Sequence, residues 1–195
     1  MKKFILIVIL LISSKDFAQS RYNYKQGSKF IEKAQTEIQK GNLSEAQMNL
    51  EKAGKSNYGF CGNAWASAES KINLLKAEIF NRKNEFDKSL SVLDSMAGCG
   101  FGADCEARDS LKIVTLSLKF GSEKVKKSFK NVMAVKVKPP NIESSYSIYI
   151  ADLNYTFVFQ SWVGSGYSEN ENSEENDGHK FIKLIEKHKY YKLLE

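Results

Sequence analysis

The pattern of apolar residues between positions 63 and 96 constrains the fold of this chain more than any other feature. Apolar or small side chains recur there every three or four residues, which places them on one face of a helix. The pattern breaks at Lys83-Asn84, and asparagine is a residue type that commonly caps a helix N-terminus. Because two helices with so short a connection run antiparallel, the sequence predicts a helical hairpin over 63–82 and 85–96. Its expected buried face consists of Trp65, Ala68, Ile72, Leu75 and Ile79, followed by Phe86, Leu90, Leu93 and Met96.

Internal repetition extends this hairpin in both directions. A bulky, a small and a bulky residue follow one another three times with the same spacing, in the trios Leu43-Ala46-Leu50, Phe86-Ser89-Leu93 and Val125-Ser128-Val132. The second trio follows the first by 43 residues, and the third follows the second by 39. A small central residue lets two helix backbones approach closely. The sequence therefore predicts a mainly α-helical fold, with an array of three hairpins over about residues 24–134.

The first of these hairpins carries a resemblance to a known family. Phe30-Ile31-Glu32-Lys33-Ala34 is followed by Lys40-Gly41-Asn42-Leu43-Ser44-Glu45-Ala46, which resembles the tetratricopeptide repeat with its Gly-Asn-apolar-x-x-Ala break between helices. The spacing here exceeds the family period of about 34 residues, and the family's Trp-x-x-Leu-Gly opening is missing from the three copies. The resemblance implies a tetratricopeptide-repeat-like (TPR-like) array that binds proteins or peptides. A plain three-hairpin bundle is the alternative.

The N-terminus has the features of an export signal. Met1-Lys2-Lys3 is followed by an apolar run over residues 4–12 and by small residues at Ala18-Gln19-Ser20. An apolar run of this length is typical of a secretory signal and too short to span a bilayer. We expect residues 1–20 to be removed and the mature protein to be exported, periplasmic or secreted, without stable membrane insertion.

Three cysteines lie in two glycine-rich loops between the expected helices. Cys61 lies in the first loop, and Cys99 and Cys105 lie in the second. Cysteines of exported proteins mostly form disulfides, and no Cys-x-x-Cys pair suggests redox or metal chemistry. We expect Cys61 to be bridged to Cys99 or Cys105, which would tie two repeats together. A local bridge between Cys99 and Cys105 is the competing possibility.

The third repeat combines an apolar face with many lysines. Its expected buried face consists of Ala107, Leu111, Val114 and Leu118, then Val125, Phe129 and Val132. Lysines crowd its end, at Lys119, Lys124, Lys126, Lys127 and Lys130. They form either a surface for an anionic partner or an ordinary solvated helix face.

The period of the pattern changes from 3.6 to two after Pro139-Pro140, which predicts a β-hairpin over residues 143–163 with its turn at Ala151-Asp152. Its aromatic side chains could pack in a core or form a binding surface. An acidic segment over 168–177 is expected to be a flexible loop, and 178–188 a helix. The predicted organisation is a signal over 1–20, a helical repeat domain over 21–134 and a small α+β region over 135–195.

The motifs of common catalytic and cofactor sites are missing from the sequence. It has no nucleophile elbow, no phosphate-binding loop and no His-Glu-x-x-His pair. We expect no enzyme, no cofactor, no metal site and no nucleic-acid partner. The leading interpretation is a non-catalytic protein–protein interaction scaffold in the cell envelope. The alternatives are an envelope-associated protein that binds anionic polymers or lipids through its lysines, and an unrecognised enzyme.

Overall fold

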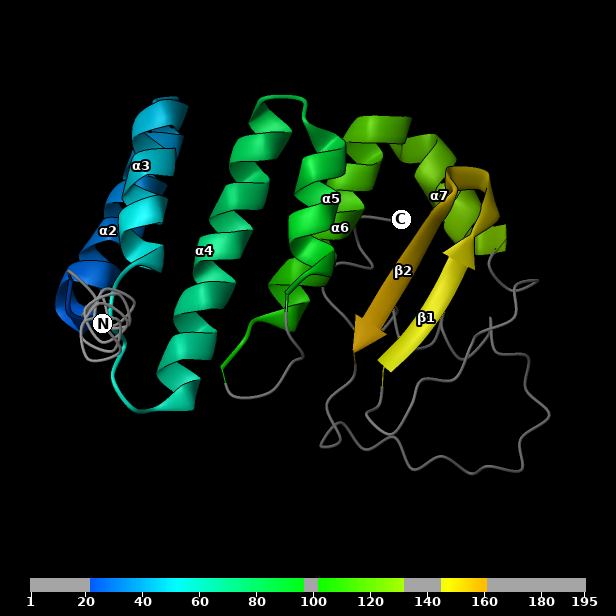
Figure 1. The fold of residues 1–195 in the computed structure, drawn as a ribbon. Helices are drawn as coiled ribbons and strands as arrows, with labels where there is room; N and C mark the ends of the chain where they lie inside the picture. Colours follow the sequence, from blue (N-terminus) through cyan, green and yellow to red (C-terminus); the bar gives the residue numbers. More distant parts are fainter. Residues whose placement is uncertain (1–21, 97–101, 132–144, 161–195) are drawn as a thin grey trace, which may run out of the picture. The chain divides into compact units, whose positions relative to one another are not determined.

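The computed structural model describes residues 22–96, 102–131 and 145–160 (Figure 1). These residues form six helices followed by a two-stranded antiparallel hairpin, which confirms the mainly α-helical fold predicted from the sequence. The chain divides into two compact units, Met1–Cys61 and Gly62–Glu195. The β-hairpin thus belongs to the same unit as the last four helices. The boundary expected at 139–140 lies within this second unit and outside the described residues.

The first unit contains the helical hairpin of α2 (Tyr24–Gln39) and α3 (Leu43–Gly54). Asn23 caps α2 in a capping box, because its side chain accepts from the Gln26 amide while the Gln26 side chain accepts from the Asn23 amide. The chain after α3 folds back so that Tyr58 covers Gly27, where an added Cβ would lie 2.7 Å from the tyrosine hydroxyl. The buried side chains of this hairpin are apolar except for Asn49 of α3: Ile31, Ala34, Ile38, Ala46, Leu50 and Ala53.

The second unit contains α4 (Gly62–Arg82), α5 (Phe86–Asp94), α6 (Cys105–Phe120) and α7 (Ser122–Asn131). Figure 1 shows α5 running antiparallel to α4, as the sequence predicts. Most of the expected face is buried, namely Ala68, Ile72, Ile79, Leu90, Leu93 and Met96. Leu75 and Phe86 are half-buried. Trp65, in the first turn of α4, is 42% exposed, so the prediction that it belongs to the buried face is wrong.

The turns within the first two hairpins are built alike. The Asn42 amide donates to the Glu37 carbonyl at 2.9 Å, and the Glu85 amide donates to the Phe80 carbonyl at 2.9 Å. The residue before each donor is left-handed, with φ of 82° at Gly41 and 58° at Asn84. The prediction that Asn84 caps α5 is therefore wrong, and Glu85 occupies the N-cap position. Asparagine suits both roles, because it tolerates the left-handed conformation that ends a helix.

The small residue of each trio is buried. Ala46 and Ser89 are fully buried, and Ser128 is nearly so. The small residue of each trio therefore lies on the buried face of the second helix of its hairpin, and Val132 of the third trio lies outside the described residues.

The β-hairpin consists of β1 (Ser145–Ile150) and β2 (Tyr155–Gln160), with Ile150 paired to Tyr155 and Ser145 paired to Gln160. A 3-10 turn, η2 (Ala151–Leu153), joins the strands, so the predicted hairpin and turn are confirmed over the described residues. Phe157 is fully buried and lies edge-on to Phe129 of α7, with 5.8 Å between ring centroids. The helix expected over 178–188 and the acidic segment over 168–177 lie outside the described residues.

Candidate functional site

Helix α6 does not bury the face that the sequence predicts. Its buried side chains include three charged ones, Arg108, Asp109 and Lys112. Leu118 is 53% exposed, so the prediction that it belongs to the core is wrong. The remaining members of the expected face, Ala107, Leu111 and Val114, are half-buried. The reason is that α4, α5 and α7 all pack on α6, so the helix is covered on more than one side.

Lys112 is among the largest fully buried side chains of the described residues. Its Nζ lies 2.7 Å from Oδ1 of Asp94, the last residue of α5. The side chain of Lys112 is 2% exposed, whereas that of Asp94 is 35% exposed. Burial lowers the pKa of Lys112, and the neighbouring Asp94 carboxylate opposes this shift. Lys112 Nζ also lies 5.5 Å from the ring centroid of Phe157, so a strand of the β-hairpin covers it.

The same carboxylate oxygen holds the β-hairpin. The Tyr155 hydroxyl, at the start of β2, donates to Asp94 Oδ1 at 2.8 Å. Burial raises the pKa of Tyr155, and the negative charge of Asp94 raises it further. One oxygen atom on α5 therefore accepts from the next helix, α6, and from β2, which lies much further along the chain.

A second ion pair completes this site. Arg108 Nε donates to Asp109 Oδ1 at 2.8 Å, and both side chains are almost fully buried. We call Asp94, Arg108, Asp109, Lys112 and Tyr155 the buried ionic cluster. Its two cations and two carboxylates balance. A lysine with a lowered pKa beside a carboxylate and a tyrosine is a combination that some enzymes use. Here, however, the groups bond to one another, as in a structural network.

A smaller polar network joins α4, α5 and α6. Asn81 Nδ2 donates to Thr115 Oγ1 at 2.9 Å, and Ser89 Oγ donates to the Ala77 carbonyl at 3.1 Å and lies 3.2 Å from Thr115 Oγ1. The Asp104 amide, at the start of α6, donates to Ser70 Oγ at 3.0 Å. The partners on α4 and α6 are 34 residues apart in both the Asn81 and the Ser70 bond, so the two helices run parallel.

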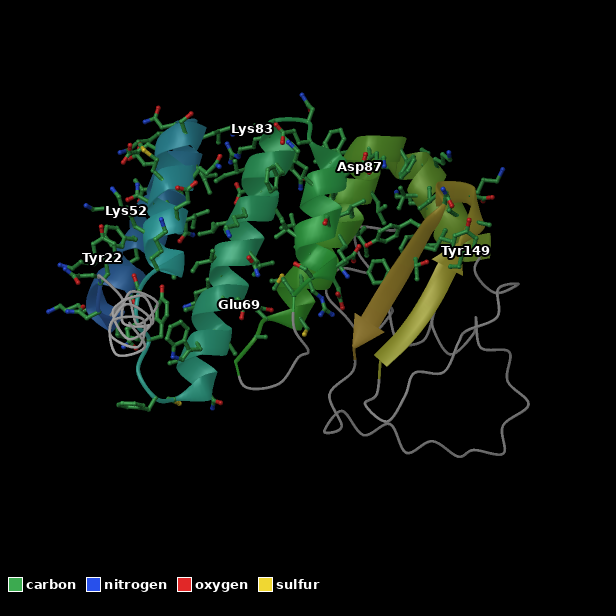
Figure 2. The ribbon with its side chains drawn as sticks, viewed as in Figure 1. Tyr22, Lys52, Glu69, Lys83, Asp87 and Tyr149 are labelled. Carbon is green, nitrogen blue, oxygen red and sulfur yellow. The ribbon has the colours of Figure 1, made fainter. Side chains whose placement is uncertain are left out.

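The predicted lysine surface is divided in the structure. Lys119 forms an ion pair with Asp87 at the beginning of α5, and Lys126 lies 3.8 Å from Glu123. Figure 2 labels Asp87 near the turn between α4 and α5. The three other lysines, Lys124, Lys127 and Lys130, are exposed. We call these three the basic face of α7.

The cysteines do not form the bridge that we expected. Cys61 is free and exposed, whereas Cys105, the first residue of α6, is disulfide-bonded. The remaining cysteine of the chain, Cys99, lies outside the described residues. A bridge between cysteines six residues apart closes a shorter loop than one reaching back to Cys61, and therefore orders fewer residues.

The buried ionic cluster was missed in the sequence, although one signal pointed to it. Ile113 and Leu116 fall outside the expected stripe of α6, so this helix is apolar on two sides. A helix covered on two sides buries some of the charged residues between its apolar stripes, and buried charges need partners. The partners Asp94 and Tyr155 could not be named from the sequence.

Within the part of the chain that the structure describes, no helix has both the length and the hydropathy needed to cross a bilayer. No group of three His, Cys, Asp or Glu side chains among these residues is placed to hold a metal ion. Comparisons of the chain with protein-family models, with curated proteins and with solved structures found no match.

Proposed function

We propose that this protein is an exported, non-catalytic scaffold that binds a protein partner in the cell envelope through its helical hairpins. The observation that carries the proposal is the apolar stripe of α6, formed by Leu111, Val114 and Leu118. The spacing of these residues places them on one helix face. Leu111 packs against the core of Ala77, Leu93 and Met96, Val114 is half-buried, and Leu118 is 53% exposed. The uncovered end of this apolar stripe, at Leu118, suits contact with another protein.

Two features support a TPR-like scaffold. The first helices of the second and third hairpins, α4 and α6, run parallel and are joined by two hydrogen bonds, as in a stacked array of hairpins. The α2–α3 and α4–α5 turns share one hydrogen-bond pattern, with 43 residues between equivalent positions. Export rests on the charged and apolar N-terminus of the sequence.

The test is capture of an envelope partner by residues 21–195, followed by binding measurements with the purified partner. Leu118→Glu places a charge on the apolar stripe, and we expect it to weaken binding by about tenfold or more, as loss of an apolar anchor commonly does. The matched control is Met48→Glu on α3, because Met48 is also exposed, at 48%, but lies in the first unit. Equal binding by wild type and Leu118→Glu would contradict the proposal.

A second candidate function is binding of anionic polymers or lipids. It is favoured by α7, which carries four lysines against one glutamate, with the basic face exposed. Reversing the basic face (Lys124→Glu, Lys127→Glu and Lys130→Glu) should abolish such binding. The matched control reverses three exposed lysines of α2, Lys25, Lys29 and Lys33. Binding that weakens steeply with salt and is lost only in the α7 variant would favour this second candidate.

A further inference from the structure

We propose that the β1–β2 hairpin is an acid-released cover over Lys112, and that protonation of the Asp94 carboxylate triggers its release. This inference concerns a conformational change and does not depend on which partner the protein binds. It follows from the arrangement of the buried ionic cluster.

The trigger is one carboxylate oxygen that accepts two hydrogen bonds. Asp94 Oδ1 accepts from Lys112 Nζ at 2.7 Å and from the Tyr155 hydroxyl at 2.8 Å. Asp94 is also the member of this trio that solvent reaches, since its side chain is 35% exposed while that of Lys112 is 2% exposed. A proton from solvent can therefore reach the carboxylate while the hairpin is still docked.

Protonation leaves the cluster with excess positive charge. Among the described residues, the charged or titratable groups that act on Lys112 are Asp94 from α5 and Arg108 and Asp109 from α6, and Tyr155 of β2 shares the Asp94 oxygen. Asp109 already pairs with Arg108 at 2.8 Å. When Asp94 becomes neutral, two buried cations face one carboxylate. A buried cation without a counter-ion is strongly unfavourable, and water at Lys112 relieves it.

The hairpin is the element that can move to admit water. Phe157 lies against Lys112, so displacement of β2 exposes the ammonium group. A two-stranded sheet is marginally stable by itself, so this one depends on its packing against the helices. Ile150, Leu153 and Phe157 are buried, the Tyr155 hydroxyl donates to Asp94, and Ser128 Oγ donates to Asp152 Oδ2 at 3.5 Å. The helices have their own core of Ala77, Leu93 and Met96 and can stay packed.

Hydrogen exchange measured by mass spectrometry tests the proposal on the mature chain. Peptides from residues 145–160 are compared with peptides from α4, α5 and α6 at about pH 7 and about pH 3. Labelling times are scaled so that unprotected amides exchange equally at both pH values. We expect protection of the hairpin to fall about tenfold or more at the lower pH while the helices stay protected. Unchanged hairpin protection, or equal loss in α4–α6, would overturn the proposal.

Three variants isolate the trigger. Asp94→Asn mimics the protonated acid, so its hairpin should be unprotected already at about pH 7. The matched control is Asp87→Asn, because Asp87 also pairs with a lysine of α6 but at an exposed site, and it should behave as wild type. Lys112→Met removes the buried cation and should keep the hairpin protected at low pH. An acid response that persists in Lys112→Met, or a similar loss of protection in Asp87→Asn and Asp94→Asn, would overturn the proposal.

Discussion

Helices α5 and α6 are joined by two ion pairs of the same chemical type in different surroundings. Asp87 pairs with Lys119, and Asp94, seven residues later on α5, pairs with Lys112, seven residues earlier on α6. In the first pair the side chains are 84% and 30% exposed, whereas in the second the lysine is 2% exposed. Water stabilises the separated charges of the first pair but not the buried lysine of the second. Both pairs join the same two helices, but Phe157 of the β-hairpin lies over Lys112, with 5.5 Å between Nζ and the ring centroid, and this cover contributes to the difference.

The strongest way to test this comparison is to remove one carboxylate from each pair. Asp94→Ala should lower the free energy of unfolding by about 3 kcal/mol, the lower end of the range for breaking a buried pair, because Asp94 itself is partly exposed. Asp87→Ala should lower it by less than about 1 kcal/mol. Urea denaturation followed by circular dichroism measures both. Equal effects would show that burial of Lys112 does not separate the two pairs.

The apolar hairpin of the first unit provides a comparison without charges. Ala46 of α3 is fully buried where α2 and α3 approach closely. Ala46→Leu should overpack this contact and lower stability on the order of 1–3 kcal/mol. The urea midpoint is the measurement, and Met48→Leu is the control because Met48 is exposed on the same helix. An unchanged midpoint in Ala46→Leu would argue against close packing at the small residue of the repeat.

Alkaline titration distinguishes the two partners of Asp94. Because the pKa of Lys112 is lowered from its ordinary value of 10.5, the unfolded chain binds more protons just below that pH, and stability should rise with pH there. The pKa of Tyr155 is raised from 10.0, so its contribution is present below pH 10.0 and is lost above it. The free energy of unfolding is measured across this pH range. Its rise with pH should be missing in Lys112→Met, and its fall should be missing in Tyr155→Phe. A wild-type profile in both variants would contradict this assignment.

The smallest expected effect belongs to the exposed pair. A double-mutant cycle on Asp87 and Lys119 should give a coupling energy of about 0.2–1 kcal/mol that decreases as salt is added. The same cycle on Asp94 and Lys112 should give a larger coupling that depends less on salt. If both couplings decreased alike, the second pair would be in contact with solvent.

Parts of this molecule differ in how well the sequence predicts them. In the α2–α3 hairpin the buried side chains are apolar except for Asn49, so helical periodicity identifies Ala34, Ile38 and Leu50 directly. In α6 helical periodicity does not identify the buried face. It takes only apolar side chains into account, whereas Arg108 and Lys112 are buried because they have ion-pair partners. The exposure of the basic face of α7 follows from residue type alone, because lysine is a common residue on exposed helix faces. The buried ionic cluster depends on contacts between segments far apart in the chain, and these are set by tertiary packing.

The side-chain bonds between α4 and α6 have a further consequence for how one hairpin is placed on the next. Apolar surfaces can slide past each other by one helical turn, about 5.4 Å, and still bury much of the same area. The Asn81–Thr115 and Ser70–Asp104 bonds would both break in such a slip. Asn81 Oδ1 already has no hydrogen-bond partner among the described residues. A slip would also break the hydrogen bond from Asn81 Nδ2 to Thr115, which is unfavourable for a buried amide. These bonds therefore select one axial register, and an array extended in the same way would keep a constant step from hairpin to hairpin.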